Sequence, residues 1–128
     1  MERLLLVGLG GGLGSMARYV LGGLVGRWKG GWTFPFETLL VNVAGCLAIG
    51  VLASLAEARG VFGGTTRAFL FVGLLGGFTT FSTFGYETFQ LLRDGQLGAA
   101  GLSAGLQLAG GLVAVWGGAV LARLAWGG

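Results

Sequence analysis

Several residue types that soluble enzymes use for chemistry are scarce in this chain of 128 residues. It has no histidine, one cysteine (Cys46) and one proline (Pro35), and only 10% of its residues are charged. The lack of histidine and of a second thiol excludes histidine acid–base chemistry, Cys/His nucleophilic pairs, Cys/His metal clusters and an internal disulfide. An ordinary soluble domain is also excluded, because such domains carry about 25% charged residues.

Apolar residues and glycine are abundant instead. Hydrophobic residues make up 54% of the chain, the mean hydropathy is +0.82, and there are 29 glycines. This composition predicts an integral membrane protein in contact with a lipid bilayer, with helices packed closely through small residues. Glycines at four-residue spacing mark the expected packing faces: Gly8 with Gly12, Gly10 with Gly14, and Gly101 with Gly105. The net charge of +3 contains no basic run, so no nucleic-acid partner is expected.

The apolar runs predict an all-α integral membrane fold with four transmembrane helices in one domain, residues 1–128. Each run is long enough to cross a bilayer. Tryptophan and basic residues in the connections are typical of the membrane interface. The expected spans are residues 4–26, 38–56, 68–92 and 97–122.

The third span contains a segment that an ordinary membrane helix does not tolerate. The pair Gly76-Gly77 combines a high helix cost with freedom at positive φ. Four hydroxyl side chains and three phenylalanines follow, and hydroxyls this dense are costly in hydrocarbon unless they face protein, water or a ligand. We therefore predict a helix broken at mid-membrane depth beside a polar passage. The residues concerned are Thr79, Thr80, Ser82 and Thr83, interleaved with Phe78, Phe81 and Phe84.

A few polar residues in the other spans each have two interpretations. Arg18 either snorkels to the interface or faces an aqueous vestibule that attracts anions. Asn42 either bonds a neighbouring helix or donates to a passing anion. Glu87 is either a solvated carboxylate near a helix end or part of a polar track. Ser103 and Gln107, one turn apart, either complete a polar groove or bond another helix.

Basic residues flanking the spans are divided almost equally between the two sides. Four of them lie on the side of the termini and the second connection, and three lie on the other, so the positive-inside signal is nearly absent. This balance predicts insertion in both orientations, and hence a dual-topology, antiparallel homodimer. The two groups are Arg3, Arg59, Arg67 and Arg123 against Arg27, Lys29 and Arg93.

Three segments give the chain a resemblance to the Fluc (CrcB-like) family of small membrane fluoride channels. They are Gly-Gly-Leu-Gly-Ser-Met-Ala-Arg18-Tyr19, Thr38-Leu-Leu-Val-Asn42-Val-Ala-Gly45 and Gly76-Gly-Phe-Thr-Thr-Phe-Ser-Thr-Phe84. The resemblance implies an antiparallel homodimer with two pores and a central structural sodium ion held by the backbone carbonyls of Gly76 and Thr79. It implies that the fluoride pore is lined by Asn42, Phe81, Phe84, Ser82 and Thr83, with Arg18 near the vestibule.

The resemblance thus predicts a passive channel, not an enzyme, that exports fluoride across the inner membrane of a prokaryotic cell to reduce its toxicity. No protein partner beyond the second copy is implied. The alternative is a small four-helix dimeric multidrug-type transporter, which needs an intramembrane carboxylate. The charge in the first span is the cation Arg18, the wrong sign for that mechanism. A structural subunit without transport is a third possibility, and a broken helix argues against it.

Overall fold

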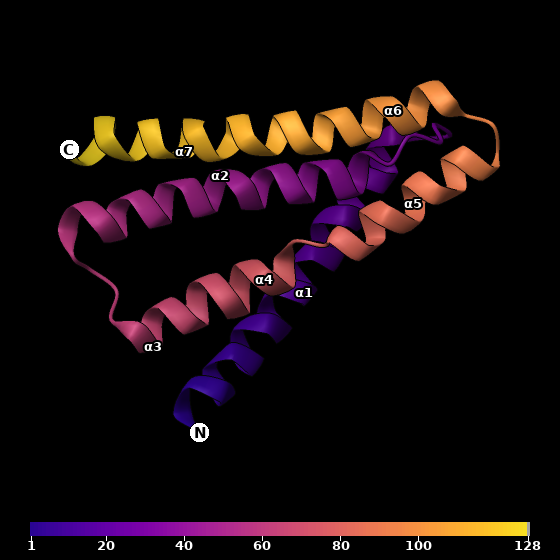
Figure 1. Cartoon of the computed structure of the whole chain (residues 1–128). Helices are drawn as coiled ribbons and strands as arrows, with labels where there is room; N and C mark the ends of the chain where they lie inside the picture. Colours follow the sequence, from indigo (N-terminus) through magenta and orange to yellow (C-terminus); the bar gives the residue numbers. More distant parts are fainter. Residues whose placement is uncertain (128) are drawn as a thin grey trace.

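A computed structural model describes residues 1–127 as helices joined by short connections (Figure 1). Gly128, the last residue of the predicted domain 1–128, lies outside the described residues. In chain order the elements are α1 (Glu2–Lys29), α2 (Phe36–Arg59), α3 (Gly64–Arg67), η1 (Ala68–Leu75), α4 (Gly76–Phe78), α5 (Phe81–Arg93), α6 (Leu97–Gly105), η2 (Leu106–Gly110) and α7 (Gly111–Trp126). The segments η1 and η2 are π-helical and continue the α-helices beside them.

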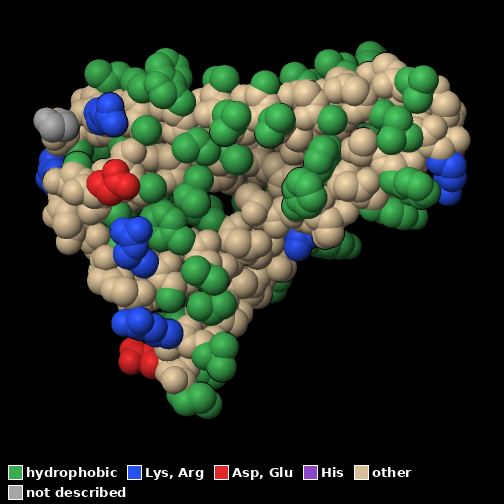
Figure 2. Space-filling view, in the orientation of Figure 1, with side chains coloured by type: hydrophobic (Ala, Val, Ile, Leu, Met, Phe, Trp, Pro, Cys, Tyr) green, Lys and Arg blue, Asp and Glu red, His purple; other side chains and the backbone are tan. Residues whose placement is uncertain are grey.

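Within residues 1–127, four helical stretches are long and apolar enough to cross a membrane: Glu2–Lys29, Phe36–Arg59, Gly64–Arg93 and Leu97–Trp126. Each includes one of the predicted ranges and extends beyond it. Hydrophobic side chains cover much of the outer surface, and most of the basic side chains visible in Figure 2 gather at one end of the molecule. An exposed apolar surface of this kind suits lipid. The prediction of an all-helical protein with four membrane-length helices is confirmed.

The first helix packs against the helix formed by α3, η1 and α4, and glycines bring the two backbones into contact. A Cβ atom at Gly10 would lie 2.6 Å from the carbonyl oxygen of Phe69. A Cβ atom at Gly14 would collide with the Leu74 backbone, and one at Gly77 with the Gly11 backbone. Only glycine permits this approach, so the sequence spacing at Gly10 and Gly14 does mark a packing face.

The second close pair is α2 with α7, which run side by side along most of their length (Figure 1). Here Gly50 faces the Val115 backbone, and Gly118 faces the Leu47 backbone. The other predicted packing glycines do not take part. Within the described chain, no atom of another element lies within 4 Å of a Cβ placed at Gly8, Gly12, Gly101 or Gly105, so these four make no close contact with another helix of the same chain.

The third helical stretch lies along α1 and then diverges from it as α5 (Figure 1). Both chain ends and the α2–α3 connection lie toward one end of the molecule, and the α5–α6 connection lies toward the other. The arrangement leaves the junction between α4 and α5 next to α1 on one side and α2 on the other.

Candidate functional site

Helical geometry stops between α4 and α5, at Thr79 and Thr80. Both residues are extended, with φ −85° and ψ 158° at Thr79 and φ −150° and ψ 111° at Thr80. The side chain of Thr80 caps the new helix, because its Oγ1 accepts a hydrogen bond from Thr83 N over 3.3 Å. Serine and threonine are favoured at this capping position, where they satisfy free N–H groups. We call Thr79 and Thr80 the helix break.

The glycine pair before the break has a different role from the one its sequence suggested. Gly76 is helical, with φ −62° and ψ −38°, so it does not use the positive φ that glycine makes available. Gly77 is also helical, and its lack of a side chain lets α4 touch the backbone of α1 at Gly11. Gly77 therefore permits packing against α1, and the extended residues follow one residue later, after Phe78.

Asn42 on α2 pairs with the break through both ends of its amide. Its Oδ1 accepts a hydrogen bond from Thr80 N over 2.8 Å, and its Nδ2 donates to Thr80 O over 3.0 Å. The same nitrogen donates to Gln107 Oε1 on η2 over 3.0 Å. Both N–H bonds of the Asn42 amide thus have partners in this chain. Of the two interpretations drawn from the sequence, a bond to neighbouring helices describes these contacts.

Arg18 on α1 reaches the other end of the break. Its Nε donates to the carbonyl oxygen of Gly77 over 3.1 Å, and Ser15 Oγ donates to the same oxygen over 3.4 Å. The last carbonyls of a helix have no intrahelical partner and carry its negative dipole end, so a cation is favourable there. Arg18 therefore caps the helix that ends at Phe78.

Two carbonyl oxygens of the break region are left free by these contacts. Thr79 N and Thr79 Oγ1 both donate to Leu75 O over 3.0 Å, while Gly77 O and Thr80 O are bonded as described above. Within residues 1–127, no hydrogen-bond donor of the kind just described reaches Gly76 O or Thr79 O. Gly76 is exposed and Thr79 is half-buried, so their oxygens remain available to a ligand or to another chain.

A cavity of about 630 Å³ opens beside the break, between α1, α2 and α5. Two arginines, Arg18 and Arg27, and two glutamates, Glu37 and Glu87, line it together with the hydroxyl side chains Thr38, Thr80 and Thr83. Acidic and basic residues are thus equal in number on its walls. Of the residues predicted as site residues, Arg18 and Thr83 line this cavity, and Asn42 lies behind Thr80 in hydrogen-bond contact with it.

Phe81 and Phe84 lie together on the first turn of α5. Their ring centroids are 5.5 Å apart and their planes meet at 68°, an edge-to-face pair. Phe84 is half-buried, whereas Phe81 is 81% exposed and the neighbouring Ser82 is also exposed. The two rings and Ser82 thus project from the break without lining the large cavity.

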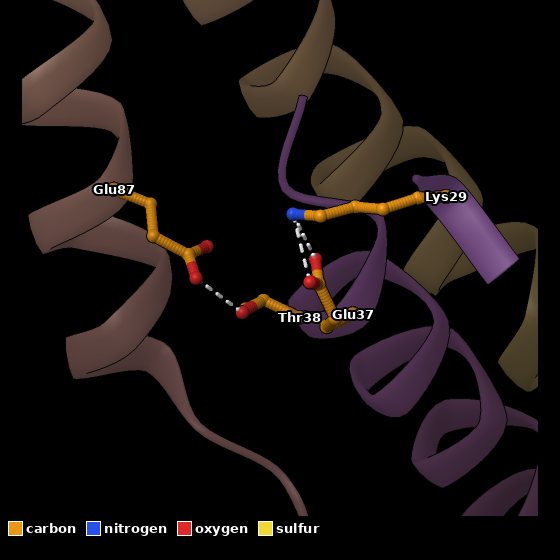
Figure 3. A network of polar contacts seen from close by, with 4 residues as sticks. All are labelled: Lys29, Glu37, Thr38 and Glu87. Carbon is orange, nitrogen blue, oxygen red and sulfur yellow. Dashed lines mark hydrogen bonds and ion pairs between the residues drawn. The ribbon is translucent and has the colours of Figure 1, made fainter. Parts of the chain in front are cut away.

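A second polar cluster consists of Lys29, Glu37, Thr38 and Glu87 (Figure 3), and the last three line the cavity. Lys29 at the end of α1 pairs with Glu37 at the start of α2, with 2.7 Å between Nζ and Oε1. Beside this pair, Thr38 Oγ1 donates to Glu87 Oε1 over 2.8 Å. Glu37 and Glu87 also line a second cavity of about 290 Å³, so the cluster borders both cavities.

Glu87 is not the solvated helix-end carboxylate of the first interpretation. Its Oε2 is buried and has no partner among the described residues. Two further buried side-chain atoms have no hydrogen-bond partner among residues 1–127. They are Ser103 Oγ and Gln107 Nε2. Ser103 is completely buried. Polar atoms of this kind carry a free-energy cost, and they commonly mark a place where water or a ligand binds.

Sequence reasoning alone did not select Thr38, Glu37 and Lys29 as site residues. A signal for Thr38 was present, since it lies one helical turn before Asn42 and shares its face. The ion pair between Lys29 and Glu37 joins two elements across a loop, so no spacing rule predicts it.

Fold and site define a class: a small all-helical, multi-pass membrane protein with two extended residues beside a polar, hydroxyl-lined cavity. The chain belongs to the family described as CrcB-like protein, Camphor Resistance (CrcB), whose model matches residues 5–119. It is 48% identical over 124 residues to a protein of Methylobacillus flagellatus, and the match covers 97% of each chain. It is 52% identical over 104 residues to a protein of Thermus thermophilus, covering 81% of this chain and 82% of the relative. Both relatives are named fluoride-specific ion channel FluC.

Proposed function

We propose that this protein is a passive, fluoride-selective ion channel that lets fluoride leave the cell across the inner membrane of a prokaryote. The observation that carries the proposal is the match along nearly the whole chain to proteins named fluoride-specific ion channels. Two arginines and three hydroxyl side chains line the cavity and can attract and bind an anion, while the two carboxylates there, Glu37 and Glu87, are bonded to Lys29 and Thr38.

The phenylalanines supply the second element of the proposed pathway. The edge of an aromatic ring is the positive end of its quadrupole, so a ring turned edge-on attracts an anion. Phe81 and Phe84 stand edge-to-face at the break, close to the hydroxyls of Ser82 and Thr83. In our proposal a fluoride ion that has lost part of its water passes these ring edges and hydroxyls. Asn42 and Arg18 position the break, and Arg18 also contributes positive charge near the vestibule.

The pathway in our proposal is completed by a second copy of the chain in the opposite orientation. A single chain leaves Phe81 81% exposed, so a pore that this ring lines needs a further wall from another chain. The near-equal division of flanking basic residues favours both orientations in the membrane. The break then lies at mid-membrane depth, where its free backbone groups must be buried against protein. A C-terminal reporter found on one side of the membrane only would contradict this assembly.

A structural sodium ion fits the oxygen atoms that the break leaves free. The carbonyls of Gly76 and Thr79 have no hydrogen-bond partner within residues 1–127, and two antiparallel copies would bring four such oxygens together. Hard oxygen ligands suit a hard cation. When bound, the ion supplies a fixed positive charge next to the anion path. Among the described residues no cluster of His, Cys, Asp or Glu offers a side-chain metal site, so these main-chain oxygens are the ligands we propose.

The test is fluoride efflux from liposomes that contain the purified protein, measured with an ion electrode and compared with chloride efflux. We expect rapid fluoride efflux, little chloride efflux, and no requirement for a pH gradient. A multidrug-type transporter would instead couple transport of an organic cation to protons through a carboxylate such as Glu87. Equal fluoride and chloride rates, or efflux no faster than from empty liposomes, would refute the proposed function.

A further inference from the structure

Gln107 on η2 reaches Asn42, the side chain that holds Thr80 at the helix break. Asn42 Nδ2 donates to Gln107 Oε1 over 3.0 Å. The helices approach closely at this level, because a Cβ at Gly111 would lie 3.3 Å from Cys46 Sγ and one at Gly110 would lie 3.5 Å from Val43 Cγ2. Two glycines therefore bring the fourth membrane-length helix near enough for the two amides to meet.

The backbone of Thr80 fixes the direction of both amides. Thr80 N–H can only donate, so Asn42 must turn Oδ1 toward it, and Nδ2 then faces Thr80 O and Gln107. Because Nδ2 can only donate, Gln107 must present its acceptor oxygen to Asn42. Turning either amide over would place two donors or two acceptors against each other. The assignment thus follows from the main chain.

Two features of Gln107 favour a specific role over simple packing. It lies in a π-helical turn, Leu106–Gly110, and such turns re-aim side chains and occur often at functional sites. Its Nε2 is buried without a partner in the described chain. An apolar side chain of similar length would avoid that cost, so the acceptor oxygen is the part of Gln107 that the structure uses.

We propose that Gln107 is a positioning residue for the helix break. It orients the Asn42 amide, and through that amide it holds Thr80 extended. The inference goes beyond the proposed function, because it concerns the conformation of the break and requires no contact with an ion.

The test is amide hydrogen exchange at Thr80 in the full-length, detergent-solubilised protein, comparing Gln107→Met with the wild type. Losing one oriented hydrogen bond is expected to speed exchange of Thr80 N–H about fivefold to tenfold. Gln90→Met is the matched control, because the Gln90 side chain on α5 makes no hydrogen bond within residues 1–127. Its Thr80 exchange should equal that of the wild type.

The double variant shows whether Gln107 affects Thr80 through the Asn42 amide or through a general weakening of helix packing. Asn42→Ala should speed Thr80 exchange more than Gln107→Met does, and adding Gln107→Met to it should change nothing further. Wild-type exchange in Gln107→Met, or effects that multiply in the double variant, would overturn the proposal.

A second variant covers the case in which Gln107→Met fails to assemble. Gln107→Asn keeps the polarity but is one methylene shorter, and it should also speed Thr80 exchange. Wild-type exchange in Gln107→Asn would overturn the proposal too. Fluoride efflux measured in parallel keeps the two proposals apart: a wild type without efflux refutes the channel and leaves the exchange result standing.

Discussion

The two tightly packed helix pairs of this protein use glycine in the same way but for different purposes. In the pair α2–α7, Gly50 and Gly118 bring two continuous helices into backbone contact. In the pair formed by α1 with η1 and α4, Gly10, Gly14 and Gly77 do the same, but the contact ends where helical geometry stops. In the second pair, Arg18 and Ser15 on α1 bond the backbone beside the place where helical geometry stops. In α2–α7, the side-chain bond to the facing backbone, from Arg59 to Trp126 O, lies at the helix ends.

The difference indicates a division of labour. The pair α2–α7 is a scaffold held by close packing, which in lipid replaces the missing hydrophobic drive between helices. The pair around the break needs the same close approach and, in addition, polar caps for the backbone groups that the break leaves unpaired. Four predictions test this comparison, in order of decreasing expected effect.

The largest effect is expected from Gly118→Val on the scaffold pair. A Cβ at Gly118 would collide with the Leu47 backbone, so the helices must separate at a cost of about 3 kcal/mol or more. We expect little monodisperse protein and a lower unfolding temperature. Gly117→Val is the matched control, because a Cβ there meets nothing within 4 Å in the described chain. Equal yields of the two variants would show that α2–α7 contact does not hold the fold.

The next effect concerns the rings at the break. Phe81→Ile and Phe84→Ile keep bulk but remove the positive ring edge, and a loss of ~2 kcal/mol at one site slows passage roughly thirtyfold. The rate of fluoride efflux from liposomes measures this loss. The comparison is valid only for variants that elute as a dimer, as the wild type is expected to do. Well-assembled Ile variants with wild-type efflux would make both rings packing residues.

Replacing Arg18 tests whether this residue acts by capping the helix end at Gly77 O or only by its positive charge. Arg18 and Arg27 line the same cavity, but of these two arginines only Arg18 bonds the backbone next to the break, at Gly77 O. Losing a charge-assisted hydrogen bond costs about 1.5 kcal/mol, so Arg18→Gln should lower fluoride efflux about tenfold. Arg27→Gln removes the same charge and should lower it less. Equal losses would mean that Arg18 acts through its charge alone.

The smallest effect is expected at Thr79. The proposed sodium ligand there is the main-chain oxygen, and serine retains the hydroxyl that donates to Leu75 O. Thr79→Ser should therefore leave fluoride efflux within about twofold of wild type, because an isosteric hydroxyl preserves the local hydrogen bond. A large loss of fluoride efflux would mean that the Thr79 methyl group, which lies against Gly45, is needed for the conformation of the break.

The sequence alone determined the class of the fold and the location of the unusual segment. Apolar runs separated by Trp- and Arg-rich connections sufficed for four membrane-length helices, because length and composition decide whether a helix can cross a bilayer. The density of hydroxyls from Thr79 to Thr83 marked the segment, since such groups need polar partners in lipid. The resemblance to the Fluc (CrcB-like) family added the prediction that the transported ion is fluoride.

Only the tertiary structure decided which residues hold that segment. The spacing rules treat Gly8, Gly12, Gly101 and Gly105 like Gly10 and Gly14, yet only Gly10 and Gly14 contact another helix of the chain. The break falls at Thr79 and Thr80 and not at the glycine pair, because Gly77 is used for contact with α1. The bonds from Asn42 to Thr80 and from Arg18 to Gly77 join residues 38 and 59 positions apart. Local sequence sets helix periodicity, but the rotation of each helix and the partners of its polar atoms depend on how all the helices pack together.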